Sequence, residues 1–392
     1  MKSVPYATQW IDKDDVEAVS KALNSDYLTQ GPRVAELENR LANYCGAKYA
    51  VALNSGTSAL HAACFASEIG KGDEVITSPI TFVASANCVL YCGGKPVFAD
   101  INEDTINIDP DEISKKITKK TRALIPVHFA GYPAALKEMR NIAKKHNLLV
   151  IEDACHALGA EYESKKIGAG QYSDMVVLSF HAVKHITTGE GGMVLTNDDS
   201  LYRKLLLFRS HGITRQLDQL RSRNEGAWYY EMQALGFNYR ITDIQCALGL
   251  NQLKKLSRFI RRRKEIVSEY DEAFSRFEEL KLLPNRTYVG SAHHLYVLQF
   301  KQERLKTTRK RIFEEYRNRG IGVNVHYIPV YAHPYYKKLG YRKGLCPKAE
   351  KYYQEAITLP LFPKMTNADV KKVIKTTKII VEKYSKRRYE QN

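Results

Sequence analysis

The sequence predicts an α/β protein with a large, mostly parallel sheet domain and a smaller α+β domain after it. Two observations lead to this fold class. Apolar runs of strand length alternate with helix-patterned segments through the first half of the chain, which indicates a sheet with helices on both faces. A long helical pattern over 242–277 is then followed by a mixed region. We expect a large domain over 1–250 and a small one over 251–392, and the N-terminal segment is a candidate to pack with the small domain.

The elements follow in order from the spacing of apolar residues. Positions three and four apart predict helices over 12–24 and 33–46, and Gly46 is a suitable helix stop. A helix rich in small residues opens at 54–58 and runs to 67. Further helices are predicted over 82–91, 136–146 and, bent along its length, 242–277. The predicted strands cover residues 49–53, 74–77, 95–99, 123–127, 148–152, 175–180 and 193–196. The mixed region comprises 294–300, 309–319 and 322–327.

The composition is typical of a soluble globular protein. The chain is 44% hydrophobic and 26% charged, and none of its apolar stretches has the length of a membrane span. Its first residues have no apolar signal-peptide core, so a cytoplasmic location is the simplest expectation. The seven cysteines form no CxxC pair. His181 and His185 are four apart, but the glycines after them disfavour a helical metal pair, and we expect no metal.

The net charge of +17 has three possible explanations. Basic residues concentrate late in the chain, as in the run 258–264. Solvated helix faces are the favoured explanation, and steering of an anionic nucleotide sugar is the second. Nucleic-acid binding is the third. No base-reading motif accompanies the charge, so we expect no nucleic-acid partner.

Lys184 lies between a predicted strand and a glycine-rich bend. A single lysine in such a turn is usually a solvated loop residue. A desolvated amine, however, loses its proton more easily and can attack carbonyl groups. The hypothesis is that Lys184 forms a Schiff base with pyridoxal phosphate.

Two further segments follow predicted strands and supply what that cofactor requires. Asn54–Ser58 joins a strand to a helix, where free backbone N–H groups and hydroxyls can hold a phosphate; a plain helix cap is the alternative. Asp153 ends another strand and can keep a pyridine nitrogen protonated, and His156 lies nearby. Phe82 could stack on the ring, although a phenylalanine is more often core. The order of the three segments, each after a strand, favours one shared site.

With these motifs the chain resembles the DegT/DnrJ/EryC1/StrS family of sugar aminotransferases. The motifs that carry the resemblance are Leu28–Pro32, Asn54–Leu60, Glu152–Ala157, Ser179–Gly192 and Gly236–Arg240, and it covers nearly the whole chain. It implies a pyridoxal-phosphate-dependent transferase of fold type I, like aspartate aminotransferase. A narrower likeness in Ser179–Gly192, Leu207–Gly212 and Val325–Tyr331 points to the branch that serves pseudaminic acid biosynthesis.

The resemblance implies a role for each matching position. Lys184 would be the Schiff-base lysine and proton shuttle, and Asp153 would pair with the ring nitrogen beside His156. The cofactor would be held by Thr57, Ser58, Phe82, Asp153, His156, Ser179, Lys184 and Asn238, the last from the neighbouring subunit. The substrates would contact Tyr6, Asp26, Tyr27, Leu28, Thr29, Gly56, Ser179, Asn238, Arg240, Asn324, Val325, His326 and Tyr327. Arg240 is the candidate anchor for a glutamate carboxylate.

The implied reaction moves the amino group of L-glutamate, which leaves as 2-oxoglutarate, to C4 of a UDP-linked 4-keto-6-deoxy-N-acetylhexosamine. The expected sugar is UDP-2-acetamido-2,6-dideoxy-β-L-arabino-hex-4-ulose. A homodimer with shared active sites would be required. The alternatives are aminotransferases of the 4-amino-4-deoxy-L-arabinose or bacillosamine type and, from another class, a non-catalytic regulatory or binding protein. His185 replaces the proline that the resemblance leads us to expect after the lysine.

Overall fold

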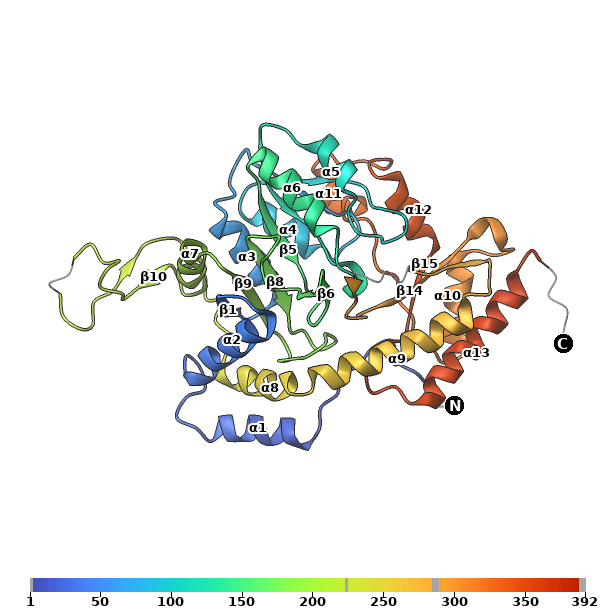
Figure 1. Ribbon diagram of the computed structural model, residues 1–392, viewed down its shortest axis with the longest axis horizontal. Coiled ribbons are helices and arrows are strands. Elements are labelled where there is room, and N and C mark those ends of the chain that lie inside the picture. Colours follow the sequence, from blue (N-terminus) through green and yellow to red (C-terminus); the bar gives the residue numbers. More distant parts are fainter. Residues whose placement is uncertain (1–2, 223–224, 284–288, 388–392) are drawn as a thin grey trace.

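The computed structural model describes residues 3–222, 225–283 and 289–387. Its centre is a seven-stranded sheet in the order β1-β9-β8-β5-β4-β2-β3 (Figure 1). Strand β9 runs antiparallel to both of its neighbours, and the other strands are parallel. The strands are β1 Tyr49–Leu53, β2 Glu74–Thr77, β3 Lys95–Phe98, β4 Thr121–Ile125, β5 Leu149–Asp153, β8 Met175–Ser179 and β9 Gly192–Thr196. The predicted mostly parallel sheet is confirmed.

Helices cover both faces of this sheet because successive strand residues point to opposite sides. Val51, Ile151 and Val177 pack on the face of α3 and α7, whereas Ala52 and Val176 pack on the opposite face with α2. The helices of this part are α1 Lys13–Leu23, α2 Pro32–Cys45, α3 Gly56–Ala66, α4 Ala84–Tyr91, α5 Pro110–Lys116, α6 Leu136–His146 and α7 Asp199–Arg209. The carboxyl ends of the parallel strands therefore remain available for a site.

The predicted helix over 242–277 is two helices. Thr242 caps α8 (Asp243–Leu253). The helix is interrupted at residues 254–255, and α9 (Leu256–Phe274) continues toward the second part of the molecule (Figure 1). At the break, Lys255 makes ion pairs with Asp12 and Asp15, the latter at 2.9 Å. These carboxylates at the start of α1 hold the joint in place, so the prediction of one continuous helix is wrong.

The C-terminal part has a second core around a three-stranded antiparallel sheet, β12-β14-β15. Val4 belongs to this core and pairs with Ile321, so the N-terminal segment packs with C-terminal residues. The predicted boundary at residue 250 stays a prediction. The elements are β12 Leu280–Lys281, β14 Tyr296–Phe300, β15 Ala356–Leu359, α10 Arg309–Asn318, α11 Pro334–Lys338, α12 Pro347–Glu355 and α13 Asn367–Tyr384, with 3₁₀ turns Gln302–Arg304 and Val330–Ala332. A further 3₁₀ turn, Phe129–Gly131, lies between β4 and α6.

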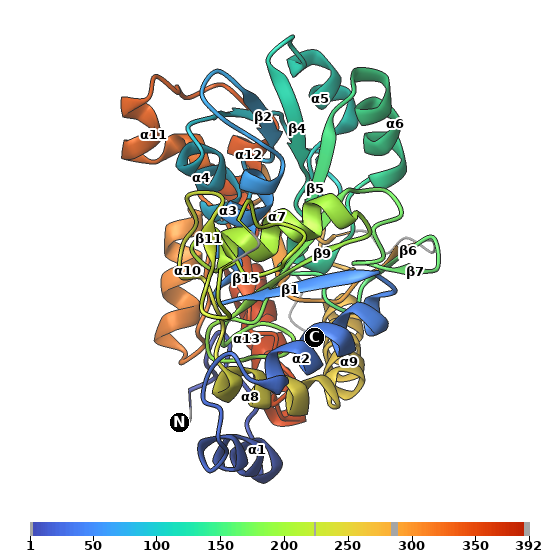
Figure 2. The same ribbon diagram turned by 90° about the vertical axis from the view of Figure 1, so that its left-hand side faces the viewer.

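An arm protrudes from the body between α7 and α8 (Figures 1 and 2). It carries the short hairpin of β10 (Ile213–Thr214) and β11 (Glu231–Met232). Several large apolar side chains on it are exposed: Leu217, Trp228, Met232, Leu235 and Phe237. A third small sheet consists of β13 Val289–Gly290, β6 Glu161–Tyr162 and β7 Lys165–Lys166. In the described part of the chain, no helix is both long and apolar enough to cross a membrane.

Candidate active site

Three loops at the carboxyl ends of β1, β5 and β8 meet around Gly56. A Cβ atom on Gly56 would lie 3.0 Å from Cβ of Ser179 and 3.4 Å from Sγ of Cys155. Glycine at this position therefore lets the three loops approach each other. The predicted convergence of the phosphate-loop, aspartate and lysine segments is confirmed.

Lys184 lies in the loop between β8 and β9. Phe180 closes this loop, since its N–H donates to the Gly191 carbonyl at 2.8 Å and its own carbonyl accepts from Thr188 at 3.0 Å. Burial lowers the pKa of the Lys184 amine below its ordinary value, and the Arg263 cation lowers it further; Cys155 and Asp153 oppose that shift. An amine in this setting sheds its proton more readily than a solvated lysine does.

The Asp153 carboxylate is buried and accepts two hydrogen bonds. Ser85 Oγ donates to its Oδ2 at 2.5 Å, and the backbone N–H of Cys155 donates to its Oδ1 at 3.1 Å. The Thr81 hydroxyl lies 2.7 Å from Ser85 Oγ and can donate to it. These hydrogen bonds fix the orientation of the carboxylate. Sequence reasoning missed Ser85 and Thr81, because only the fold brings α4 beside the end of β5.

His156 is buried next to Asp153. Its Nε2 lies 3.3 Å from the Tyr327 hydroxyl, and its ring centroid lies 4.3 Å from that of His294. Within the described residues its Nδ1 atom has no hydrogen-bond partner. Burial, together with the nearby Lys184, lowers the pKa of His156 well below its ordinary value, so the ring is neutral at pH 7. A buried polar atom without a partner is costly, and a ligand can satisfy it.

The structure explains His185, which the sequence motif left unaccounted for. Its ring is buried, and Nε2 lies 3.0 Å from the Ala292 carbonyl oxygen. Because a carbonyl only accepts, Nε2 must carry the proton and donate. A proline could not make this bond. His185 therefore ties the residue after Lys184 to the segment before β14.

The loop before α3 forms a helix N-terminus, as predicted. Ser55 is the N-cap, and the Ser58 hydroxyl is used in the capping box, accepting from the Ser55 N–H at 3.0 Å and donating to Asn54 Oδ1 at 2.7 Å. The Thr57 hydroxyl makes no hydrogen bond among the described residues. The free N–H groups of the first turn and the helix dipole favour an anion here. Thr57 is thus the hydroxyl best placed to add a bond to a phosphate.

The N-terminal segment and residues 324–327 form a second wall. The Tyr6 hydroxyl lies 3.4 Å from His326 Nε2, and His326 Nδ1 lies 2.9 Å from the Thr358 hydroxyl. Burial lowers the pKa of His326 to about 3, with a contribution from Lys184, and it raises the pKa of Tyr6. Both groups are uncharged at neutral pH. The structure therefore brings Tyr6, His326 and Tyr327 to the Lys184 side, with Asn324 exposed and Val325 half-buried beside them.

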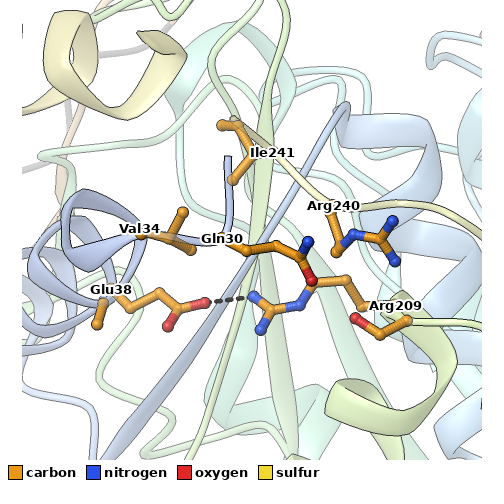
Figure 3. Close-up of a pocket in the computed structure, with 9 residues that line it drawn as sticks. Gln30, Val34, Glu38, Arg209, Arg240 and Ile241 are labelled. Atoms are coloured by element: carbon orange, nitrogen blue, oxygen red, sulfur yellow. Dashed lines mark hydrogen bonds and ion pairs between the residues drawn. The ribbon is translucent and has the colours of Figure 1, made fainter. Parts of the chain in front are cut away.

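Arg240 lies elsewhere, in a pocket of about 260 Å³ (Figure 3). Gln30, Arg209 and Ser210 also line this pocket, and Arg209 pairs with Glu38 at 2.5 Å. Asp243 fixes the preceding loop by accepting from the Gly31 N–H at 2.7 Å. Unlike Arg209, Arg240 has no ion pair among the described residues, so its guanidinium remains available to a ligand in this pocket.

The remaining predicted residues lie on the surface of the single chain. Phe82 is 59% exposed, before α4, so it is free to stack on a ligand. Asn238 is exposed at the base of the arm, where it bridges to Ser210. Residues 26–29 are exposed, and Thr29 bridges to Thr242. Within the part of the chain that the structure describes, no hydrogen bond or ion pair joins these residues to Lys184.

The fold and the site together define a class: fold type I aminotransferases, whose cofactor is pyridoxal phosphate. The model of the DegT/DnrJ/EryC1/StrS aminotransferase family matches residues 9–378, and the chain belongs to this family. A spore coat polysaccharide biosynthesis protein, SpsC of Bacillus subtilis, is 40% identical over 97% of both chains. A UDP-4-amino-4,6-dideoxy-N-acetyl-beta-L-altrosamine transaminase of Campylobacter jejuni is 40% identical over 98% of this chain and 99% of its own.

Solved structures agree. Helicobacter pylori PseC, an aminotransferase involved in the biosynthesis of pseudoaminic acid, superposes with a TM-score of 0.90 at 36% identity, covering 97% of this chain and all of its own. The pyridoxal-phosphate form of a putative sugar aminotransferase, Spr1654 of Streptococcus pneumoniae, gives 0.88 at 32% identity, with 97% and 99% covered. The predicted family, fold and enzyme class are confirmed: the chain is a sugar aminotransferase.

The residues present fit pyridoxal phosphate. The cofactor needs an amine for its carbonyl, an acid for its ring nitrogen and a cradle for its phosphate. Lys184, Asp153 and the helix N-terminus at Gly56 supply these three, and they are in contact through Gly56, Cys155 and Ser179. Among the described residues, no group of three or more His, Cys, Asp or Glu side chains could hold a metal ion.

Proposed function

We propose that this protein transfers the amino group of L-glutamate to C4 of a UDP-linked 4-keto-6-deoxy-N-acetylhexosamine. The observation that carries the proposal is the placement of the Lys184 amine between two walls. Asp153 and His156 form the cofactor wall, and Tyr6, His326 and Tyr327 form the wall that faces a sugar nucleotide. The expected sugar is the altrosamine precursor of pseudaminic acid biosynthesis, supported by the similar Campylobacter and Helicobacter enzymes.

In this proposal the residues of the chain have distinct tasks. Bound pyridoxal phosphate supplies an electron sink for the carbon next to the transferred nitrogen. Asp153, oriented by the hydrogen bonds from Ser85 and from the Cys155 N–H, would hold a proton at the ring nitrogen. Lys184 Nζ would hold the cofactor until the amino group of the donor displaces it, and the freed amine would then carry a proton between two carbon atoms, a task that a lowered pKa favours.

The proposal extends to binding. Thr57 and Ser179 hold the phosphate with the N–H groups of α3, and Phe82 stacks on the ring. Arg240, in the pocket with Arg209, binds the carboxylate of the amino donor, because a guanidinium pairs well with carboxylates. Residues 26–29 and 324–327 bind the nucleotide sugar.

We also propose a cytoplasmic homodimer with shared sites. Asn238 reaches the phosphate of the neighbouring subunit in this arrangement. The exposed apolar side chains of the arm support it, since large exposed apolar groups are typical of interaction surfaces.

The first test addresses the cofactor chemistry. Replacing Lys184 with Ala should abolish the visible absorbance of the lysine-bound cofactor and lower the rate of transfer on the order of a thousandfold, as the loss of a proton-transfer group does. Lys254→Ala, an exposed lysine at the break between α8 and α9, serves as the matched control and should be unaffected. Survival of both colour and transfer in the Lys184 variant would disprove the assignment.

The second test addresses the substrate. The enzyme is incubated with L-glutamate and a panel of UDP-4-keto sugars, and the configuration of the product at C4 and C5 is assigned by NMR. An altro product supports the proposal, whereas a gluco product refutes it. A bacillosamine-type or 4-amino-4-deoxy-L-arabinose-type activity is the alternative. SpsC is as similar to this chain as the Campylobacter transaminase is, which is why the panel includes other sugars.

A further inference from the structure

Arg263 on α9 is a buried cation of unusual setting. It is 1% exposed and has no ion pair with a carboxylate among the described residues. Its NH1 atom donates to the carbonyls of Leu361 at 2.9 Å and His294 at 3.2 Å, and its Nε has no partner in the described part of the chain. Burying a charge without a counter-ion lowers stability, which suggests that Arg263 has a functional role.

The guanidinium holds the segment that anchors the Lys184 loop. His293 and His294 accept its hydrogen bonds through their carbonyls. The segment is further fixed because the His294 N–H donates to Ala130 at 2.8 Å. Ala292, the residue before His293, accepts a hydrogen bond from the ring of His185. Arg263 therefore reaches the residue after Lys184 through two hydrogen-bonded steps.

Three imidazoles fill the space between these groups. The His294 ring centroid lies 4.3 Å from that of His156 and 5.2 Å from that of His185. None of the three Nδ1 atoms has a partner among the described residues. Burial lowers the pKa of all three well below the ordinary value. The rings are thus neutral at pH 7, and Arg263 is the group in this cluster that carries a positive charge near Lys184.

We propose that Arg263, acting through the 292–294 segment and His185, is a positioning residue that keeps the Lys184 amine in place. The inference rests on the proposed role of Lys184 as the amine that meets carbonyl groups. His185 is then the link between the lysine loop and this support.

The charges around Lys184 give the sign of the effect. Asp153 and Cys155 raise the pKa of the amine, whereas burial and Arg263 lower it. His156, His185, His294 and His326 also face the amine but are neutral. Removing the guanidinium charge leaves burial as the only influence named here that lowers the pKa of Lys184, so this pKa should rise.

The experiment measures the amine itself rather than turnover. The full chain, freed of cofactor by dialysis with L-glutamate, is treated with limiting acetic anhydride over a range of pH. Mass spectrometry then gives the acetylation of Lys184 relative to exposed Lys13. For Arg263→Gln, which loses the charge but can still donate to a carbonyl, the labelling midpoint should rise, so that Lys184 is labelled less at pH 7 than in the wild-type protein.

Two matched variants separate charge from folding. Arg263→Lys keeps the cation and should keep the wild-type midpoint. Arg261→Gln changes an exposed arginine on the same helix and should also leave it unchanged. An unchanged midpoint in Arg263→Gln would overturn the inference. Failure of the proposed function is distinguishable, because it shows as unchanged colour and transfer in Lys184→Ala whatever the midpoint does.

A measurement on the wild-type chain covers the case in which Arg263→Gln does not fold. Nitrogen NMR of ¹⁵N-histidine-labelled protein should show His185 as the neutral form with the proton on Nε2 at pH 7, and His294 as neutral. A charged His185 or His294 at that pH would overturn the inference, because a second cation would then stand between Arg263 and the lysine.

Discussion

At the scale of single residues, Asp153 shows how one group distant in sequence and one nearby group together orient a buried carboxylate. The Ser85 hydroxyl donates to Oδ2 from the first turns of α4, and the Cys155 N–H donates to Oδ1 from the adjacent loop. In the proposed site, both bonds hold the carboxylate in the orientation that lets it pair with a protonated ring nitrogen. Ser85 is therefore a positioning residue for the ring acid.

We predict that Ser85→Ala lowers kcat/KM about ten- to a hundredfold, since a hydrogen bond to a charged group contributes roughly 1.5–3 kcal/mol. The absorbance of the bound cofactor should also shift to titrate over a different pH range. Steady-state kinetics and a spectral pH titration check this. Ser114→Ala, at an exposed serine on α5, is the control. Equal kinetics in both variants would contradict the role given to Ser85.

Sequence alone predicted the residues whose positions follow from strand order, and it missed those that tertiary packing supplies. Lys184, Asp153 and the loop at Gly56 each follow a strand, so their convergence could be anticipated. Ser85 and His294 approach from other elements and have no local signal. Arg263 shows the opposite error: the basic run around it was explained as a solvated helix face, yet this side chain is buried.

At the scale of elements, α10 and α13 are joined through one carboxylate. Glu315 on α10 accepts from Lys383 at 2.7 Å and from Tyr384 at 2.8 Å, both on α13, and also pairs with Arg319. These hydrogen bonds, led by that of Lys383, lower the pKa of Glu315 to about 2. Because the folded pKa lies below the unfolded one, the contact stabilises the fold above about pH 4.5 and loses that effect as pH falls toward 2.

We predict that Glu315→Gln lowers the melting temperature by a few degrees at pH 7 and that the difference from wild type shrinks as the pH falls below about 4.5. Thermal unfolding followed by circular dichroism over this range measures it. Glu314→Gln, at the exposed neighbour on α10, should change little at any pH. A difference that stays constant down to pH 3 would show that Glu315 does not act through its charge.

The spacing of apolar residues predicted the bounds of amphipathic helices. It could not predict helix ends that depend on contacts with residues far away in the sequence. The helix over 136–146 was predicted with its observed bounds, because its apolar stripe and its Asn147 stop are local. The break between α8 and α9 depends on Asp12 and Asp15, which lie far away in the sequence. Helices α5, α7 and α11 to α13 were not predicted, and in α7 only part of the apolar side is buried.

At the scale of the whole molecule, a shared active site has a quantitative signature. If Asn238 completes the site of the other subunit, a mixture of Lys184→Ala and Asn238→Ala subunits contains heterodimers with one intact site each. Denaturing and refolding the two inactive variants together should restore about one quarter of wild-type activity, because half of the dimers are mixed and each has one working site.

Each variant refolded alone serves as the control and should stay inactive. Size-exclusion chromatography with light scattering verifies that the mixture is dimeric. Activity no greater than the sum of the two controls would mean that each subunit builds its site alone. That result would move the Asn238 role to the same chain, where Asn238 already lies beside Ser210.

The N-terminal segment connects the two cores of the molecule. Val4 pairs with Ile321 in the second core, Tyr6 meets His326, and α1 contacts α8 and the joint at Lys255. A chimera that takes its C-terminal half from a relative to change sugar preference would therefore need the donor's residues 3–9 as well. Exchanging 321–327 alone would combine the N-terminal segment of one protein with the 321–327 segment of another, and their side chains would not pack together in the same way.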